Sequence, residues 1–404
     1  MESYSTQQRL IYSYAILEVM QFLDKKELYR IQILEKYFYD KLIPNCIKEM
    51  KSWNQQACYI AFEKSQFFYF LDRNTLKWDQ KKVNLVTKKG KIQTSFRFDE
   101  MWAKVLQIQD EIYFIGGNLY FHYSSKQCYR LNLKNQMMHE ITSLSKQRYG
   151  HGLCHLGQYI YATGGVDNYS IYLDHCERYD LLNNTWEDIP KFDCPIFSHS
   201  LISVRKRYLY SFGGMYEKPE AYKYQERLMR LDTHKIGRVE CNWEYFAFPS
   251  EFQQGCQYQV YQMPQLSQNG QIQEYIIFGG VGLQNNVLNR VSIFSENLKV
   301  IQDSKFSSSS EKLKIIDRFY YNQAISLDRN VVLEEYENEL KKNDIKTQDI
   351  GHQLIGAMGR FAFHVIDLDN QKIIIGDKSK GYVNHLSQRQ DDNDDEEDFI
   401  EYYD

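Results

Sequence analysis

The side chains in this sequence with the greatest capacity for chemistry are four histidines, His151, His155, His175 and His199. Imidazole can bind a metal or transfer a proton, yet these residues fall in different predicted strands and loops, without the spacing of a metal-ligand set. The sequence also lacks the GxSxG, HExxH, P-loop and GxGxxG motifs. We therefore predict no catalytic residues, no metal site, no cofactor and no enzyme activity.

Cysteine usage and hydropathy narrow the class of protein further. The eight cysteines are scattered along 404 residues without a CxxC pair, so reduced thiols are expected in place of a zinc site or a disulfide framework. The first residues are polar, and no run of about 18 apolar residues occurs, which predicts neither a secretory signal nor a membrane span. We expect a soluble cytoplasmic protein, with the cytoskeleton or a cilium as alternative locations.

Charge is unevenly distributed along the chain. The formal net charge is −4, yet residues 391–404 carry nine acidic side chains and no basic one. Such a run repels itself and usually stays solvated, so we predict an acidic, disordered tail, with docking on a basic surface as the alternative. In the rest of the chain the basic residues are spread thinly, which predicts that the protein does not bind nucleic acid.

Residues 147–190 form a unit that other parts of the chain repeat. Two alternating apolar strands joined at Leu156 and Gly157 are predicted, followed by the pair Gly164 and Gly165, a third strand and a tryptophan at 186. Glycine pairs recur at 116–117 and 213–214, at intervals of 48 and 49 residues (165 − 117 and 214 − 165), and again at 279–280. A period of about 50 residues is typical of a repeat architecture.

This order of strands, glycine pair and tryptophan resembles a kelch repeat. The resemblance implies a mainly β fold, with a kelch-type β-propeller over residues 51–390. Partial copies of the unit give six blades, with seven as the alternative. The first copy retains the second half of a blade, from Phe67 to Trp78. The sixth is the most degenerate, with a polar insertion ending near Gly356 and strands predicted at 319–326, 331–333, 361–367 and 372–375.

The amino-terminal segment, residues 1–50, has a helical pattern. Apolar residues recur at three- or four-residue steps on both sides of Asp24, which can cap a second helix, and Pro44 ends the run. Tyr12 and Glu35 depart from the F-box pattern. The segment nevertheless resembles an F-box at Ile11, Leu17, Glu18, Val19, Met20, Phe22, Leu23, Asp24, Glu27, Leu28, Ile31, Leu34 and Phe38.

An F-box binds the Skp adaptor of cullin-RING ubiquitin ligases through an apolar helical face. The resemblance therefore implies a Skp-type adaptor and a cullin as partners. The alternative is that these helices cap the open end of the propeller. The residues expected to pack the segment and bind the adaptor are Ile16, Val19, Met20, Phe22, Leu28, Ile31 and Leu34.

In propellers of this kind partners meet a face formed by loops, and kelch substrate receptors often place an Arg-x-Gly turn there. The turn from Arg148 to His151 matches this pattern. Two arginines on an aromatic surface would suit a peptide that carries carboxylates. The alternative is that Arg148 and the histidines satisfy buried backbone groups near the axis. The candidate substrate-binding residues are Arg148, Tyr149, His151, Phe197, His199, Trp102, Tyr258 and Arg318.

These features predict a substrate-recognition subunit of a Skp-cullin-F-box ubiquitin ligase, which binds a protein substrate and performs no bond chemistry itself. The alternative is a non-enzymatic kelch scaffold of the cytoskeleton or axoneme that binds filaments. An oxidase-like enzyme would need a metal-binding set of Tyr, His and Cys that cannot be placed in this sequence.

Overall fold

The computed structural model divides the chain into two compact units, Met1–Gln56 and Ala57–Asp404. The predicted amino-terminal helices and the acidic tail lie outside the residues that the structure describes. The described residues are 56–58, 67–72, 75–94, 100–101, 103–119, 123–218, 221–225, 227–247, 255–256, 259–262, 274–278, 281–282, 290–295, 300–305, 307–308, 323–342, 345–352, 354–358, 363–367, 369–370 and 372–377.

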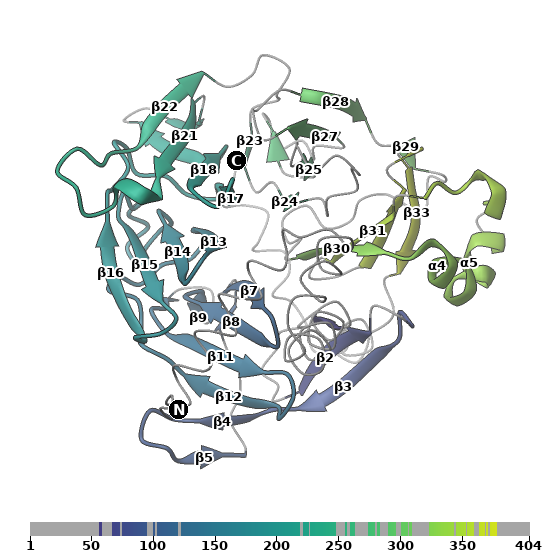
Figure 1. Ribbon diagram of the computed structural model, residues 1–404, viewed down its shortest axis with the longest axis horizontal. Helices are drawn as coiled ribbons and strands as arrows, with labels where there is room; N and C mark the ends of the chain where they lie inside the picture. The colour runs from purple at the N-terminus through teal and green to yellow at the C-terminus, as the bar shows by residue number, and fades with distance from the viewer. Residues whose placement is uncertain are drawn as a thin grey trace, which may run out of the picture. The chain divides into compact units, whose positions relative to one another are not determined.

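The unit at 147–190 folds as the sequence predicts, into one antiparallel sheet in which each strand pairs with the next (Figure 1). Tyr, Ile and Thr residues at alternating positions favour extended backbone and fill both faces of β14, whereas the last strand is largely exposed. Gly157, at φ +61°, permits the tight turn between the first two strands. The strands are β13 (Gly152–Leu156), β14 (Tyr159–Thr163), β15 (Cys176–Asp180) and β16 (Thr185–Ile189).

Three further copies form four-strand antiparallel arrays with the same order, which confirms the repeat in these regions. The first array is β7 (Lys104–Ile108), β8 (Glu111–Ile115), β11 (Cys128–Asn132) and β12 (Met137–Glu140). The next is β17 (Ser200–Val204), β18 (Tyr208–Phe212), β21 (Arg227–Asp232) and β22 (Glu244–Ala247), with the 3-10 helix η2 (Thr233–Lys235). The third is β24 (Gln259–Gln262), β25 (Glu274–Phe278), β27 (Arg290–Ser295) and β28 (Val300–Lys305).

The shortened first copy is a three-stranded sheet, and short strands extend or flank the other sheets. The three strands are β1 (Gln56–Cys58), β2 (Phe67–Asp72) and β3 (Trp78–Lys82). The additional strands are β4 (Asn84–Val86), β5 (Ile92–Gln93), β6 (Glu100–Met101), β9 (Asn118–Leu119), β10 (Tyr123–Ser124), β19 (Met215–Lys218), β20 (Ala221–Tyr224), β23 (Gly255–Cys256), β26 (Val281–Gly282) and β29 (Ser307–Ser308).

The sixth copy is a sheet, but the predicted strand at 331–333 is wrong. These residues lie in a helix, because Asp328 accepts hydrogen bonds from the backbone amides of Asn330 and Val331 and so caps its amino terminus. The missing strand lies after the insertion, where β31 pairs with β30. The elements are β30 (Gln323–Leu327), α4 (Arg329–Glu335), α5 (Glu337–Lys342), η4 (Thr347–Asp349), β31 (Leu354–Met358), β32 (Phe363–Asp367) and β33 (Lys372–Asp377).

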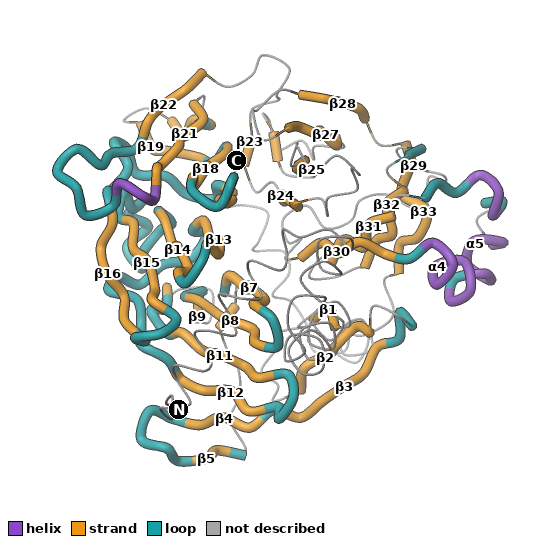
Figure 2. Tube along the Cα trace, in the orientation of Figure 1, coloured by secondary structure: helices purple, strands orange, loops and turns teal. Residues whose placement is uncertain are grey.

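Figure 2 shows strands in most of the described chain, with α4 and α5 confined to the insertion. No described helix has both the length and the apolar composition needed to cross a membrane.

Successive sheets are joined through their first strands and their late tryptophans. The first strands contact one another in the order β7, β13, β17, β24 and β30. The indole of Trp186 donates to the carbonyl oxygen of Thr142 in the preceding repeat at 2.8 Å, and Trp243 donates to Pro190 at 2.7 Å. The repeats that contain Trp186 and Trp243 therefore each donate a hydrogen bond to the repeat before them, which gives the late tryptophan a structural role in both.

Candidate functional site

The order of the strands separates the loops of each sheet into two groups. Consecutive strands run in opposite directions, so the turns after the first and third strands lie at one end of a sheet. The connections after the second and fourth strands lie at the other end. The predicted turns at 148–151 and 196–199 belong to this second group, together with the connection at 164–175.

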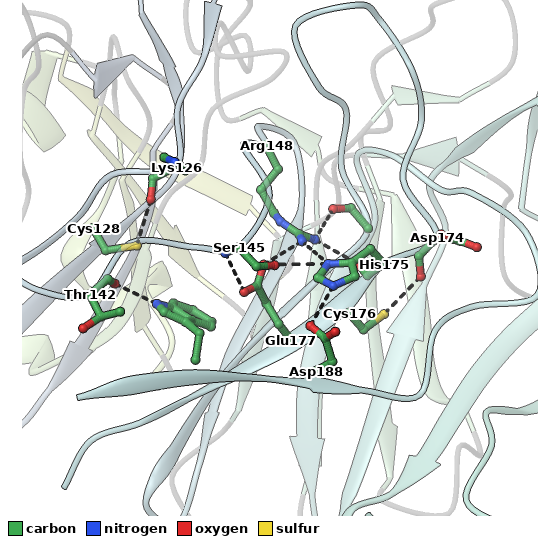
Figure 3. Close-up of polar contacts among 12 residues, drawn as sticks. Lys126, Cys128, Thr142, Ser145, Arg148, Asp174, His175, Cys176, Glu177 and Asp188 are labelled. Carbon is green, nitrogen blue, oxygen red and sulfur yellow. Dashed lines mark hydrogen bonds and ion pairs between the residues drawn. The ribbon is translucent and has the colours of Figure 1, made fainter. Parts of the chain in front are cut away.

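Arg148 lies in the connection between β12 and β13, and its side chain is fully buried. Its Nη1 donates to the carbonyl oxygens of Gly164 and His175, each at 2.8 Å, and Nη2 donates to Oε1 of Glu177 at 2.8 Å (Figure 3). The guanidinium thus satisfies backbone groups and a buried carboxylate, as in the second interpretation of the sequence. This geometry does not present Arg148 to a partner.

The contacts around Arg148 determine the tautomer of the His175 ring. Nη2 of Arg148 lies 2.6 Å from Nδ1 of His175, and a guanidinium can only donate, so Nδ1 accepts. The proton of the neutral ring is then on Nε2, which donates to Oδ1 of Asp188 at 2.9 Å. Glu177 also accepts from the backbone amide of Ser145 at 2.9 Å. The network therefore fixes the connection that leads into β13.

The two predicted histidines of this region, His151 and His199, are also buried. Burial lowers the pKa of His151 well below its usual range, and the nearby Arg148, Lys104 and His199 lower it further. Burial, with Lys104 and Arg148, lowers the pKa of His199 to about 3. His199 Nε2 lies 2.8 Å from Oγ1 of Thr163, whereas neither ring nitrogen of His151 has a partner in the described part of the chain. Both rings are neutral interior groups in this structure.

The aromatic side chains of the two turns, Tyr149 and Phe197, pack against each other. Tyr149 is partly exposed, and its ring packs edge-on against Phe197 at 6.1 Å between centroids. The ring of Tyr172 lies 5.4 Å from Phe197 on another side. Phe197 itself is buried, so it supports the two tyrosines and is not itself available to a ligand. Of these two predicted site residues, the structure places Tyr149 at the surface and Phe197 beneath it.

The most exposed apolar side chains of this region come from the connection between β14 and β15. Tyr169 is 80% exposed and Ile171 is 56% exposed. Oδ1 of Asp167 accepts from the backbone amides of both residues, at 2.8 and 3.0 Å. This turn is therefore held in one conformation by an aspartate side chain, and it displays two large side chains to solvent.

The neighbouring repeat contributes to the same surface. Ser124 in β10 donates to Asn168 at 2.7 Å, so the β9–β10 hairpin lies beside the turn at 167–171. Tyr123 on that hairpin is 60% exposed. We call the exposed residues Tyr123, Tyr169 and Ile171, together with the partly exposed Tyr149 and Tyr172, the aromatic face.

The aromatic face can bind apolar and hydrogen-bonding groups of a partner, since each tyrosine combines an apolar ring with a polar hydroxyl. No set of three His, Cys, Asp or Glu side chains that could hold a metal ion occurs in the described residues. Sequence reasoning missed four members of this face, because they lie in segments outside the repeat pattern: Tyr123, Tyr169, Ile171 and Tyr172. The polar turn DNYS at 167–170 was the available signal.

Other predicted site residues lie outside the described part of the chain. This applies to Trp102, Tyr258 and Arg318 of the candidate substrate site. It also applies to the whole candidate adaptor-binding set, which is Ile16, Val19, Met20, Phe22, Leu28, Ile31 and Leu34.

The repeated four-strand sheets with their glycine pairs are consistent with kelch blades. The family model for the Kelch motif matches residues 147–192, the unit that contains β13 to β16. The chain therefore carries a kelch motif in this region. The known proteins to which it is similar include kelch proteins.

Three curated relatives illustrate this similarity. Kelch domain-containing protein 10 of Xenopus tropicalis and of Xenopus laevis are each 34% identical over 86 residues, which is 20% of this chain and 21% of the relative. Kelch repeat and BTB domain-containing protein 2 of Ectromelia virus (strain Moscow) is 25% identical over 134 residues, which is 33% of this chain and 24% of the relative. The matched region spans about a fifth to a quarter of these relatives.

Proposed function

We propose that this protein is a non-catalytic recognition module, in which a six-bladed kelch propeller over residues 51–390 binds another protein through the aromatic face. The observation that supports the proposal is the exposure of Tyr123, Tyr169 and Ile171 on neighbouring loops whose backbones are held by internal hydrogen bonds. The match to the Kelch motif is consistent with a protein-binding role.

The chemistry of the aromatic face favours a protein over a small molecule. Tyrosine is enriched among the residues that dominate protein interfaces, because it buries a large area with few rotatable bonds. A turn that is already ordered loses less entropy on binding than a disordered one. The proposed partner is therefore a folded protein or a peptide with apolar side chains that cover Tyr169 and Ile171.

We further propose that residues 1–50 act as an F-box, so that the protein is the substrate-recognition subunit of a cullin-RING ubiquitin ligase. The support is the sequence pattern around Asp24 and Leu28. In this role the amino-terminal helices bind a Skp-type adaptor while the propeller holds a substrate. The contribution to ubiquitin transfer is proximity, which replaces a bimolecular encounter with a fixed geometry.

Substitutions at the two ends of the sheets test the aromatic face. The proteins captured by the full-length Y169D/I171D variant are compared with those captured by the control variant L182D/V239D. Leu182 and Val239 are exposed on turns between third and fourth strands. A partner that uses the aromatic face is recovered at least about tenfold less with the first variant and equally with the second, because a buried unpaired carboxylate opposes binding. Equal recovery with both variants contradicts the proposed site.

The ligase role is tested with a purified Skp-type adaptor. The full chain is expected to bind it, and M20D/L28D is expected to abolish binding while the thermal unfolding midpoint stays unchanged. The Y169D/I171D variant serves as the matched control that retains the adaptor. Absence of adaptor binding, together with co-sedimentation of the full chain with cytoskeletal filaments, would replace the ligase role by the scaffold role.

A further inference from the structure

A strongly basic segment follows the first sheet, and neither the aromatic face nor the F-box proposal uses it. Residues 77–91 contain one acidic residue, Asp79, which pairs with Lys81 at 3.5 Å. This concentration of charge contrasts with the thin spread of basic residues elsewhere. The six lysines are Lys77, Lys81, Lys82, Lys88, Lys89 and Lys91.

The β4–β5 hairpin displays three of these lysines on an ordered turn. The backbone amide of Thr87 donates to the carbonyl oxygen of Lys91 at 3.0 Å, and Oγ1 of Thr87 accepts from the amide of Lys91 at 3.2 Å. The amide of Lys88 also donates to Oε2 of Glu140 on β12, at 3.1 Å. The turn is therefore fixed to the neighbouring sheet while Lys88, Lys89 and Lys91 remain exposed.

The charge of this hairpin is largely unneutralised by the described residues. Nζ of Lys88 donates to the hydroxyl of Ser143 at 3.2 Å, which leaves its charge uncompensated. No described acidic oxygen lies within 4.0 Å of the amino groups of Lys89 or Lys91. Ile92, which follows directly in β5, is 56% exposed. The hairpin thus combines a basic turn with an apolar side chain at the outermost strand of its sheet.

We propose that the β4–β5 hairpin binds the acidic segment 391–404 of the same chain. That segment has nine acidic residues and no basic one, and it also contains apolar and aromatic residues at 399, 400, 402 and 403 that suit contact with Ile92. A nucleic acid would complement the lysines but would leave this apolar side chain uncovered. The charge and apolar content of residues 391–404 match both properties of the hairpin.

Tethering makes weak exposed ion pairs sufficient for this contact. Residues 378–390 separate the end of β33 from the acidic segment, and such a linker reaches roughly 40 Å when extended. A tether that spans the two sites gives an effective concentration of about a millimolar. Contacts between exposed charges are screened by salt, so the bound state is expected to open as the ionic strength rises. This inference is independent of the partner proposed for the aromatic face.

Cross-linking of the purified full chain tests the location of the acidic segment. A zero-length carbodiimide joins carboxylates to amines in contact, and a mixture of isotope-labelled and unlabelled chains separates links within one molecule from links between molecules. The expected links join residues 391–404 to Lys88, Lys89 or Lys91 within one chain, and they decrease severalfold in 0.5 M salt. Links that are mainly intermolecular, or spread evenly over the exposed lysines, would overturn the proposal.

Protection from a glutamate-specific protease tests the role of the lysines. Cleavage within 391–404 is expected to be severalfold faster in K88Q/K89Q/K91Q than in the wild type. The matched control is K341Q/K342Q/K346Q, which removes three exposed lysines at the α4–α5 insertion. Equal acceleration by both variants, or none by the first variant with its unfolding midpoint unchanged, would overturn the proposal.

Discussion

Arg148 and Glu177 form an ion pair in which both side chains are fully excluded from solvent. Removing charges from water is costly, and this cost is offset here by the bonds that Arg148 makes to Gly164, His175 and Glu177 together. Loss of one partner would leave the other charge buried without compensation. The pair therefore contributes more to the integrity of the turn than its attraction alone would suggest.

Replacement of Arg148 by Met is expected to lower the free energy of unfolding by about 3–5 kcal/mol, because Glu177 is left buried and unpaired. Thermal or urea unfolding measures the change. Arg227→Met is the matched control, since its pair with Asp193 is exposed and should contribute less than about 1 kcal/mol. The double change R148M/E177L should recover only the part of the loss that comes from the unpaired carboxylate, because the bonds to the carbonyl oxygens of Gly164 and His175 remain absent. An R148M variant of wild-type stability would show that the pair is dispensable.

The buried histidines make stability depend on pH. The folded-state pKa of His151 and of His199 is lowered by burial, so the unfolded chain binds more protons than the folded chain below about pH 6.5. Their contribution is therefore fully present above that pH. It is lost as the pH falls towards the folded-state values.

Each such histidine should reduce the free energy of unfolding by about 1.4 kcal/mol per pH unit below pH 6.5. Urea unfolding at pH 7.5, 6.0 and 5.0 measures the slope. His151→Leu should reduce the pH slope by the contribution of one histidine. It should change the free energy of unfolding little at pH 7.5, because the imidazole has no hydrogen-bond partner in the described structure. His155→Leu is the control, since that histidine is not fully buried. An identical slope in the H151L variant would contradict the assignment of His151 as a neutral buried group.

At the scale of the elements, Gly164, the first glycine of its pair, has a steric role between repeats. Gly164 has φ +58°, and a Cβ there would lie 2.5 Å from the carbonyl oxygen of Ile196 in the next repeat. The amide of Gly165 donates to that same oxygen at 2.8 Å. The glycine pair therefore permits two repeats to approach closely.

Gly164→Ala should lower the free energy of unfolding by about 2–4 kcal/mol, from the left-handed backbone and the close contact together. Gly157→Ala isolates the first effect, because Gly157 has φ +61° and no atom within 4 Å of a Cβ placed there. Its expected cost is about 1 kcal/mol. Thermal unfolding of both variants provides the comparison, and equal losses would show that the contact with Ile196 contributes nothing.

The elements also show why the sequence predicted some sheets well and one poorly. The unit at 147–190 has alternating apolar residues, a glycine pair and a tryptophan, and each signal has a steric cause in the sheet. The sixth copy lacks the glycine pair, and residues 331–333 are apolar enough to resemble a strand. Val332, Tyr336 and Leu340 are buried at four-residue steps, so the helical period extends over a longer segment than the three residues that resemble a strand.

The candidate site was predicted in part for a similar reason. The turn around Arg148 was found because it belongs to the repeat. The sequence left recognition and the binding of buried backbone groups as alternatives for its guanidinium, and the structure shows the second. Tyr169 and Ile171 lie in a connection whose length and composition the repeat does not define. Their exposure depends on the turn formed by Asp167, which only the structure shows.

At the scale of the whole molecule, one segment links the first two sheets directly. β3 completes the first sheet, and after Val83 the chain continues as β4, which pairs in parallel with β12 of the second sheet. Val83 and Leu85 are buried in the core of that second sheet, against Leu131 and Met138. The connection between β28 and β29 repeats this device, because β29 pairs in parallel with β33. Outer edges of two sheets are covered in this way.

This arrangement predicts that a substitution in β4 destabilises both the first and the second sheet. Leu85→Ala should cost about 2–5 kcal/mol, since it leaves a cavity in the second sheet. Hydrogen exchange should show lost amide protection in β4, in the edge of β12 and in β3, while β13 to β16 keep theirs. Ile92→Ala, on the exposed end of the same hairpin, should change stability by less than about 0.5 kcal/mol. Equal loss of protection in every described sheet would instead mean that the sheets unfold as one unit. Unchanged protection in β3 would mean that β4 does not couple the first sheet to the second.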